Sequence, residues 1–411
     1  MQHRTLTIVL ATGLALAACS SSEESASSPI QPSYTDRLAQ FDPITDDGRD
    51  DIAIGVLEDD YIHDDGYAPI RPELADQGPD TGVALYGDLM HGTLPAEFAL
   101  DPSDVESENV SQVTYTRVGA DFDPDVSPDG ELIVFASTQH RPTADIYIRH
   151  RNGSALTRLT NDPANDLMPS ISPDSKRVAF ASNRSGNWDI FVTPITGGAA
   201  VSVTSDSAHE LHPSWSADGT KLVFCRLGQT SGRWEMWVVE TENPSLSHFI
   251  GYGLFPEFSP VARAGSEGRE RILFQRSRER GSRSYGIWTV DYANGQSANM
   301  THIASSDVEA YINPTWSPDG KRVIYASVPN PDAWGDFSST RPDNANLWMI
   351  GVDEGGLVNL TSGISVDLMP AWAPGNQVYF VSDRGGADNL WVMNVNDAVL
   401  ASSAPTPTDT T

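Results

Sequence analysis

Cysteine is nearly absent from this chain of 411 residues, which contains only Cys19 and Cys225. A fold stapled by a framework of disulfides needs several cysteine pairs, so that class of small secreted domain is excluded. Cys225 ends the apolar run that begins at Leu222, and no His or Lys stands beside it. We therefore expect Cys225 to be a small buried hydrophobe rather than a reactive thiol.

Basic residues are also scarce, with 26 Lys and Arg against 56 Asp and Glu and a formal net charge of −30. Such a charge argues against nucleic acid as a partner and against binding to anionic lipid by charge. The sequence also lacks a Gly-x-Ser-x-Gly nucleophile elbow, and no α/β pattern follows its repeats. These absences argue against a serine hydrolase domain.

The one long apolar stretch of the N-terminal part, residues 6–18, follows Arg4 and ends in small residues. It is too short to span a bilayer and is typical of a signal peptide. Its end, Leu16–Cys19, resembles the lipobox of bacterial lipoproteins, which implies cleavage before Cys19 and acylation of that residue. Several acyl chains would hold the protein firmly on a membrane. Ser20 after the cysteine favours the outer membrane in Gram-negative sorting.

A phrase of the form Pro-x-Trp-Ser-Pro-Asp-Gly recurs six times along the rest of the chain. Its intact and degenerate copies begin at Pro124, Pro169, Pro213, Pro256, Pro314 and Pro370. A short β-branched run follows each copy, then a segment with an aromatic residue between aliphatic ones, and several units close on a pair such as Leu-Thr. Four short strands per unit with Pro-Asp-Gly turns, repeated six times, predict an all-β fold, a six-bladed propeller of four-stranded antiparallel blades.

The sixth unit lacks a fourth strand, because the chain turns polar after Val395. Residues 114–118, just before the first unit, resemble residues 156–159 at the end of that unit. We therefore predict that an N-terminal strand at 114–118 completes the last blade. This strand would close the ring and remove an exposed sheet edge.

These phrases resemble the PD40, or TolB-like, repeat over residues 112–396. The Ser-Pro-Asp-Gly turn, the Ser-x-Arg after the second strand (Ser182–Arg184, Ser382–Arg384) and the Leu-Thr pair fall in the expected order. The resemblance implies a WD40-like propeller; TolB itself is a periplasmic protein bound by a peptidoglycan-associated lipoprotein. This chain differs from TolB in two ways. It is expected to carry its own lipid anchor, and its residues 34–110 do not show the α/β pattern of the TolB N-terminal domain.

Composition and repeats together divide the chain into five parts. We expect a lipoprotein signal peptide over 1–18, a lipidated Ser-rich tether over 19–33, an Asp-rich region of unknown fold over 34–111, the propeller over 112–396 and a disordered tail over 397–411.

Acidic residues recur at two positions of the repeat. The aspartates of the Pro-Asp-Gly turns are assigned to structure, because Asp satisfies local turn geometry: Asp129, Asp174, Asp218 and Asp319. The position three residues before each proline reads Asp121, Asp166, Glu210, Gly253, Tyr311 and Asp367.

In a propeller, the loop into the innermost strand opens onto the central channel. The four acidic residues of the second set would then ring one mouth of the channel, with Asp123, His212 and Asn313 one residue before their prolines. Converging oxygen ligands of this kind suit a hard cation or a basic peptide. The alternative is that acidic residues cap these loops as part of the repeat. Apart from such a cation, no cofactor is expected.

A second candidate site is the basic stretch of the fourth unit. Its candidate binding residues are Arg276, Arg278, Arg280 and Arg283, together with Trp334 in the long fifth unit. Arginine forks bind carboxylates or phosphates with two hydrogen bonds, and loops after second strands would lie on the same face as the acidic mouth. The alternative is that these arginines neutralise the protein's own acidic loops.

Two classes of function remain. The first is a monomeric, membrane-anchored scaffold of the cell envelope, periplasmic or at the surface, whose loop face binds a protein, a peptide or a glycan. The second is an enzyme, either a metal-dependent lyase with a channel site or an accessory propeller of a hydrolase. His209-x-x-His212 supplies too few histidines for the lyase, because His248 and His302 lie near fourth strands.

Overall fold

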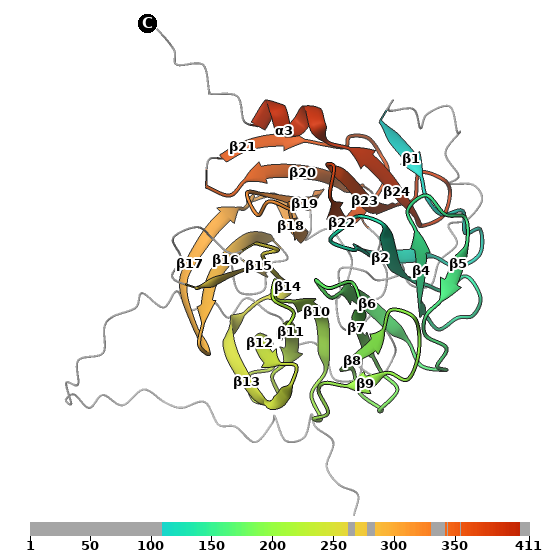
Figure 1. The fold of residues 1–411 in the computed structure, drawn as a ribbon. Coiled ribbons are helices and arrows are strands. Elements are labelled where there is room, and N and C mark those ends of the chain that lie inside the picture. Colours follow the sequence, from blue (N-terminus) through green and yellow to red (C-terminus); the bar gives the residue numbers. More distant parts are fainter. Residues whose placement is uncertain are drawn as a thin grey trace, which may run out of the picture. The chain divides into compact units, whose positions relative to one another are not determined.

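The computed structural model describes residues 109–261, 268–277, 284–329, 342, 344–353 and 355–402. Within these residues, 24 strands build six four-stranded antiparallel sheets. The sheets are arranged as blades around one axis, and their order around the ring follows the sequence (Figure 1). The predicted six-bladed, all-β propeller is therefore confirmed.

The first three blades follow one another along the chain. Blade 1 contains β2 (Asp121–Val126), β3 (Leu132–Ser137), β4 (Asp145–His150) and β5 (Leu156–Arg158). Blade 2 contains β6 (Asp166–Ile171), β7 (Arg177–Ser182), β8 (Asp189–Pro194) and β9 (Val201–Ser202). Blade 3 contains β10 (Glu210–Trp215), β11 (Lys221–Leu227), β12 (Trp234–Glu240) and β13 (Asn243–Tyr252).

The other three blades complete the ring. Blade 4 contains β14 (Leu254–Phe258), β15 (Glu270–Ser277), β16 (Tyr285–Ala293) and β17 (Gln296–Ala304). Blade 5 contains β18 (Glu309–Trp316), β19 (Arg322–Pro329), β20 (Asn346–Gly351) and β21 (Gly355–Asn359). Blade 6 contains β22 (Asp367–Ala373), β23 (Gln377–Ser382), β24 (Asn389–Asn394) and β1 (Val110–Gln112).

The core lies between neighbouring blades. Second strands such as β3 and β7 are buried on both faces, because each is covered by a blade on either side. This explains their unbroken apolar sequences. An aromatic residue occupies the same place in every second strand and is at most 3% exposed: Phe135, Phe180, Phe224, Phe274, Tyr325 and Phe380. Burial of each such side chain stabilises the fold by about 1.5–3 kcal/mol.

The Ser-Pro-Asp-Gly phrases form the turns between first and second strands. In blade 1 the Ser127 hydroxyl donates to the Asp129 carboxylate at 2.5 Å and accepts from the N–H of Leu132 at 2.9 Å. The Ser127 hydroxyl is the main reason why the pKa of Asp129 is lowered. The same serine–aspartate bond recurs at 2.6 Å in blades 2, 3 and 5. These aspartates shape turns, as their position in the repeat indicates.

An N-terminal strand closes the ring as predicted, but the predicted residues were wrong. The strand is β1, Val110–Gln112, which pairs with β24, and not residues 114–118. The Thr114 hydroxyl accepts from the N–H of Leu390 at 2.9 Å, as Thr160 does from Ile146 in blade 1. Thr114 is thus the equivalent of Thr160. The comparison of residues 114–118 with residues 156–159 was therefore out of register.

The tail begins with a short helix, α3 (Asn396–Ser402), so the disorder predicted from residue 397 does not hold for the first six residues of the tail. The helix contacts β21, and the Ser402 hydroxyl accepts from Nε of Arg322 at 2.9 Å. None of the helices in the described ranges has the length and apolar character to cross a membrane.

Candidate functional site

The acidic residues expected at the channel mouth lie inside the blades instead. Asp121, Asp166, Glu210 and Asp367 open the four inner strands β2, β6, β10 and β22, and each is at most 1% exposed. Each stands opposite the end of the second strand of its own blade, for example Asp166 opposite Ser182. None of the four side chains is open to solvent, and none of the four residues lines the channel cavity. The predicted carboxylate ring is therefore not formed.

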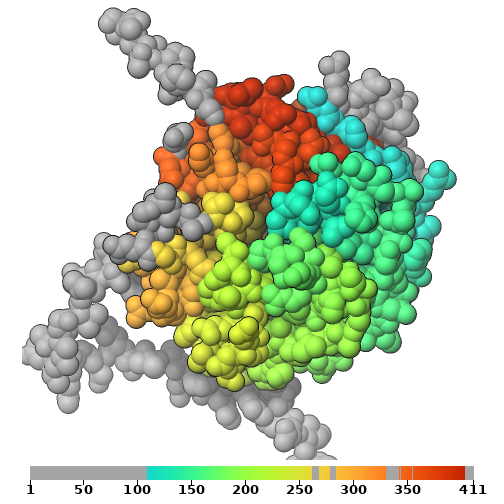
Figure 2. Space-filling model, viewed as in Figure 1, coloured from blue at the N-terminus to red at the C-terminus, as the bar shows by residue number. Residues whose placement is uncertain are grey.

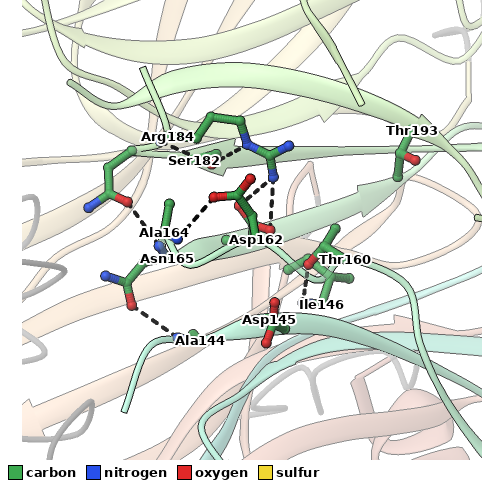
Figure 3. A network of polar contacts seen from close by, with 12 residues as sticks. Ala144, Asp145, Ile146, Thr160, Asp162, Ala164, Asn165, Ser182, Arg184 and Thr193 are labelled. Carbon is green, nitrogen blue, oxygen red and sulfur yellow. Dashed lines mark hydrogen bonds and ion pairs between the residues drawn. The ribbon is translucent and has the colours of Figure 1, made fainter. Parts of the chain in front are cut away.

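The Ser-x-Arg arginines hold two of these carboxylates. Arg184 donates to both oxygens of Asp166 at 2.8 and 2.9 Å and to the Ser182 hydroxyl at 2.9 Å, a contact visible in Figure 3. Arg384 holds Asp367 in the same way, with both bonds at 2.7 Å. Both guanidinium groups also lie over the phenylalanine of their second strand. Asp166 and Asp367 are thus partners in structural ion pairs.

The other two carboxylates of this set are satisfied differently. Asp121 accepts from the hydroxyls of Ser137 and Thr116 at 2.5 and 2.7 Å. Glu210 lies 3.8 Å from Arg226, and burial, followed by the nearby charge of Asp206, raises the pKa of Glu210 to about 9. These two side chains also stay within their blades.

The arginine-rich candidate site is only partly described. Arg276 lies on β15, where its Nη1 is 3.2 Å from Sδ of Met300 and its guanidinium lies 5.9 Å from the ring centre of Trp288. Cys19, Arg278, Arg280, Arg283 and Trp334 lie outside the described residues. The grouping of Arg276 with these residues therefore stays a prediction.

The channel itself is shaped by a bulge in every inner strand. The pairing of first with second strand shifts register at the residue before each proline, in all six blades. Those six residues have φ between 50° and 55°: Asp123, Met168, His212, Phe255, Asn313 and Met369. A left-handed backbone is costly for side chains such as Met and Phe, and it persists only where the surrounding structure imposes it.

A cavity of about 400 Å³ occupies the centre of the ring, where the space-filling view is hollowed (Figure 2). Its walls are the bulge residues, the prolines that follow them, the second halves of the inner strands and the Ser-Pro turns. Asp121, Asp166, Glu210 and Asp367 do not line it. The cavity thus belongs to the end of the channel that carries the Ser-Pro turns, opposite to the loops after the second strands.

Three carboxyl groups line this cavity, Asp123 and Asp125 from β2 and Glu257 from β14. Burial raises their pKa values to about 7, about 6 and about 8 respectively, and the charge of Asp125 adds to the effect on Glu257. One oxygen of each accepts a backbone N–H from a neighbouring blade, as Asp125 does from Ile171 at 2.6 Å. The carboxyl groups therefore join blades as well as facing the cavity.

Two residues of the cavity wall carry a buried ring nitrogen without a partner among the described residues. His212 is 7% exposed, and burial lowers its pKa to about 3, so the imidazole is neutral. Its Nε2 has no hydrogen-bond partner among the described residues, while its ring lies against Phe255 with the ring centres 3.7 Å apart and the planes tilted by 42°. Nε1 of Trp372 is likewise unpartnered in the described part of the chain, whereas Trp215 and Trp316 donate to carbonyls of the preceding blade.

The channel does not assemble a metal centre from the residues that the structure describes. No three His, Cys, Asp or Glu side chains in the described ranges lie close enough together to hold an ion.

Cys225 is fully buried in β11, and burial raises the pKa of its thiol.

Sequence reasoning missed most of the cavity. Of the residues predicted at the channel mouth, Asp123, His212 and Asn313 line it, whereas Asp125 and Glu257 were not proposed. The signal was nevertheless present: Asp125 and Glu257 stand directly after the repeat proline, and Asp123 directly before it. The bulge turns these positions toward the axis, and a count of three residues back from the proline could not show that.

Known proteins support the assignment of the fold. Residues 100–262 match the family model of PD40, the TolB beta propeller domain. A structure assigned as TolB from Agrobacterium tumefaciens superposes with a TM-score of 0.50 at 19% identity, covering 67% of this chain and 90% of that one. The predicted likeness to TolB-like PD40 propellers is thus confirmed; likeness at this identity concerns the fold alone.

The chain also resembles enzymes with propellers. It is 26% identical over 316 residues to dipeptidyl-peptidase 5 of Porphyromonas gingivalis, covering 65% of this chain and 45% of that protein. An oligogalacturonate lyase of Vibrio parahaemolyticus superposes with a TM-score of 0.49 at 14% identity, covering 72% of this chain and 96% of that one. The chain spans less than half the length of the peptidase.

Proposed function

We propose that this protein is a binding module of the cell envelope, whose propeller receives a segment of a protein partner in its central channel. The lipobox-like Leu16–Cys19 supports a lipid-anchored position at the outer membrane. A TolB-like fold supports the periplasmic side. A propeller tethered in this way would hold its partner at the membrane surface.

The observation that carries the proposal is the cavity at the Ser-Pro-turn end of the channel. Its volume of about 400 Å³ is at the lower end of ligand pockets, which suits a side chain or a short segment rather than a folded domain. Strained residues ring it in all six blades, and such strain clusters at binding sites. The loop-face arginines remain a second candidate surface for the same partner.

Replacement of one residue at the cavity rim tests the proposal. Ala217 is exposed and lines the cavity, so Ala217→Trp would obstruct it without removing a hydrogen bond. Glu242→Trp, on the exposed hairpin between β12 and β13, is the matched control. We expect immobilised wild type and Glu242→Trp to retain the same envelope protein, and Ala217→Trp to lose it. Equal retention by all three, or retention by none, would contradict the proposal.

The enzymatic alternatives have less support. A channel lyase needs several histidines or carboxylates around one ion, and the described residues contain no such group. A peptidase role would follow from the likeness to dipeptidyl-peptidase 5, of which this chain covers 45%. We therefore place binding before catalysis in the proposal.

A further inference from the structure

The loops that lead into the inner strands expose apolar side chains on one face of the ring. The residue six positions before each repeat proline lies in such a loop in five blades, whereas in blade 4 it is Ile250 of β13. Val118 is 72% exposed, Val308 and Ile364 are each 67% exposed, and Pro163 is also exposed. These four residues, the apolar tips, precede blades 1, 2, 5 and 6, which are neighbours in the ring. Single exposed apolar residues are common, but one repeat position exposed in four neighbouring blades needs a separate explanation.

The apolar tips project from loops that are fixed to their own blades. In three of these loops, the residue two positions after the tip donates its N–H to a side-chain oxygen just after the second strand. These bonds are 2.9 Å long and join Ala120 to Thr138, Asn165 to Asn183 and Val366 to Asp383. Gly119 has a φ of 85°, and a Cβ there would lie 2.7 Å from the carbonyl oxygen of Thr138. Such loops present their side chains in a fixed conformation, which lowers the entropic cost of docking.

The apolar tips lie close to one plane. They occupy equivalent positions of the repeat, and equivalent positions of repeated blades share one height along the axis of a propeller. The recurring bond behind Val118, Pro163 and Ile364 supports this equivalence. A flat surface can contact all four tips at once, whereas a peptide bound in a groove needs side chains that face one another. A bilayer is the flat surface closest to a protein with a lipid anchor.

This face lacks the acidic character of the whole chain, whose formal net charge is −30. The loops after the second strands of blades 1, 2 and 3, residues 138–144, 183–188 and 228–233, contain no Asp or Glu. Beside the apolar tips, exposed Arg117 offsets exposed Asp307, and half-buried Asp162 accepts the N–H of Ala164 at 3.0 Å. A face without surplus carboxylates approaches phosphate headgroups without repulsion.

We propose that the apolar tips form a membrane-contact face, which inserts into the headgroup region of the bilayer that carries the protein. Burial of the four apolar side chains drives the contact, and Arg117 stays at the level of the headgroups. The inference goes beyond the proposed function and shares with it only the anchor at Cys19. Contact through this face turns the channel end formed by the Ser-Pro turns away from the bilayer, so the cavity is open to a partner on the far side.

Flotation of the full chain with phosphatidylcholine vesicles tests the proposal. Cys19→Ser removes the acylation site, so that the propeller has to bind by itself. We expect this protein to float with the vesicles in low and in high salt, because the contact is apolar. Val118→Glu and Ile364→Glu should each weaken vesicle binding by ~10-fold or more. Val201→Glu is the matched control, because Val201 is 66% exposed on the outer strand β9 and should bind as before.

A dye that is sensitive to polarity locates the contact. Single cysteines at positions 118, 308 and 364 of the Cys19→Ser chain can be labelled selectively, because Cys225 is fully buried. With vesicles, the emission of the dye should shift to the blue at all three positions. It should not shift at position 201, nor at position 217 on the rim of the cavity at the opposite end of the channel.

Several results would overturn the membrane-contact face. They are absence of flotation, full binding by both glutamate variants, and a dye shift at position 201 or 217 as large as at the tips. Loss of a captured envelope protein in Val118→Glu, without vesicle binding by the parent chain, would show that the face binds a protein instead. If vesicle binding fails while Ala217→Trp still loses its envelope protein, the proposed function stands without this face.

Discussion

The pair of Asp367 and Arg384 decides whether the acidic residues before the repeat prolines serve structure or binding. Arg384→Met keeps an apolar stem and removes two bonds of 2.7 Å to Asp367 and one of 2.9 Å to Ser382. It also removes the guanidinium contacts with Phe380 and Trp391. Asp367, 1% exposed, is left as a buried acid without its cation.

Loss of one partner of a buried ion pair costs about 3–5 kcal/mol. Protonation of Asp367 limits this cost, because burial already raises its pKa and removal of Arg384 raises it further. The destabilisation should therefore be greater at pH 8 than at pH 5. Urea unfolding followed by tryptophan fluorescence measures this destabilisation. In a thermal melt at pH 8, the melting temperature should fall by about 10 °C.

Arg151→Met is the matched control. Arg151 lies 3.8 Å from Glu131 with side chains 35% and 53% exposed, so its loss should cost about 0–1 kcal/mol. The reasoning would be refuted if Arg384→Met unfolded at the wild-type urea concentration while losing the captured envelope protein. That outcome would make Asp367 and Arg384 binding residues rather than a structural pair.

Three further predictions concern other parts of the ring. Asn389→Ala should cost about 1–3 kcal/mol in urea unfolding, because Asn389 binds the backbone of Thr116 at 2.7 and 3.1 Å and so holds the closing segment; an unchanged midpoint would argue against closure at this point. Wild type should lose stability as the pH rises from about 4.5 to about 8, because folding raises the pKa of Glu257 and the folded state binds the proton more tightly. Glu257→Gln should flatten this dependence between pH 5.5 and 8.5, and an identical slope would show that Glu257 is not its source. The thiol of Cys225 should resist alkylation at pH 8 in the native protein and react after unfolding; rapid native labelling would contradict its burial.

The fold could be predicted because each repeat contains local sequence signals for its turns and strands. The Ser-Pro-Asp-Gly turns, the apolar second strands and the Leu-Thr pairs each have a position-specific physical cause, such as the Thr160 hydroxyl that accepts from Ile146 at 3.0 Å. Six such units leave little freedom in topology. The closing strand was misplaced because two Thr-containing stretches look alike, and only the hydrogen bond of Thr114 distinguishes them.

The candidate site could not be predicted in the same way. Whether an acid faces the axis or the neighbouring strand depends on the bulge at the residue before each proline, where Asp123 has a φ of 50°. The bulge turns Asp125 and Glu257 into the cavity and leaves Asp166 inside its blade. A bulge of this kind arises from pairing between strands, and no single segment encodes it.

The most direct test of the central claim is site-specific photo-crosslinking in intact cells of the native host. A photoreactive residue at position 217, at the rim of the cavity, should give a discrete adduct with one envelope protein, and the same residue at position 242 should give none. Adducts from position 242 but none from position 217 would contradict the claim that the channel end formed by the Ser-Pro turns receives the partner.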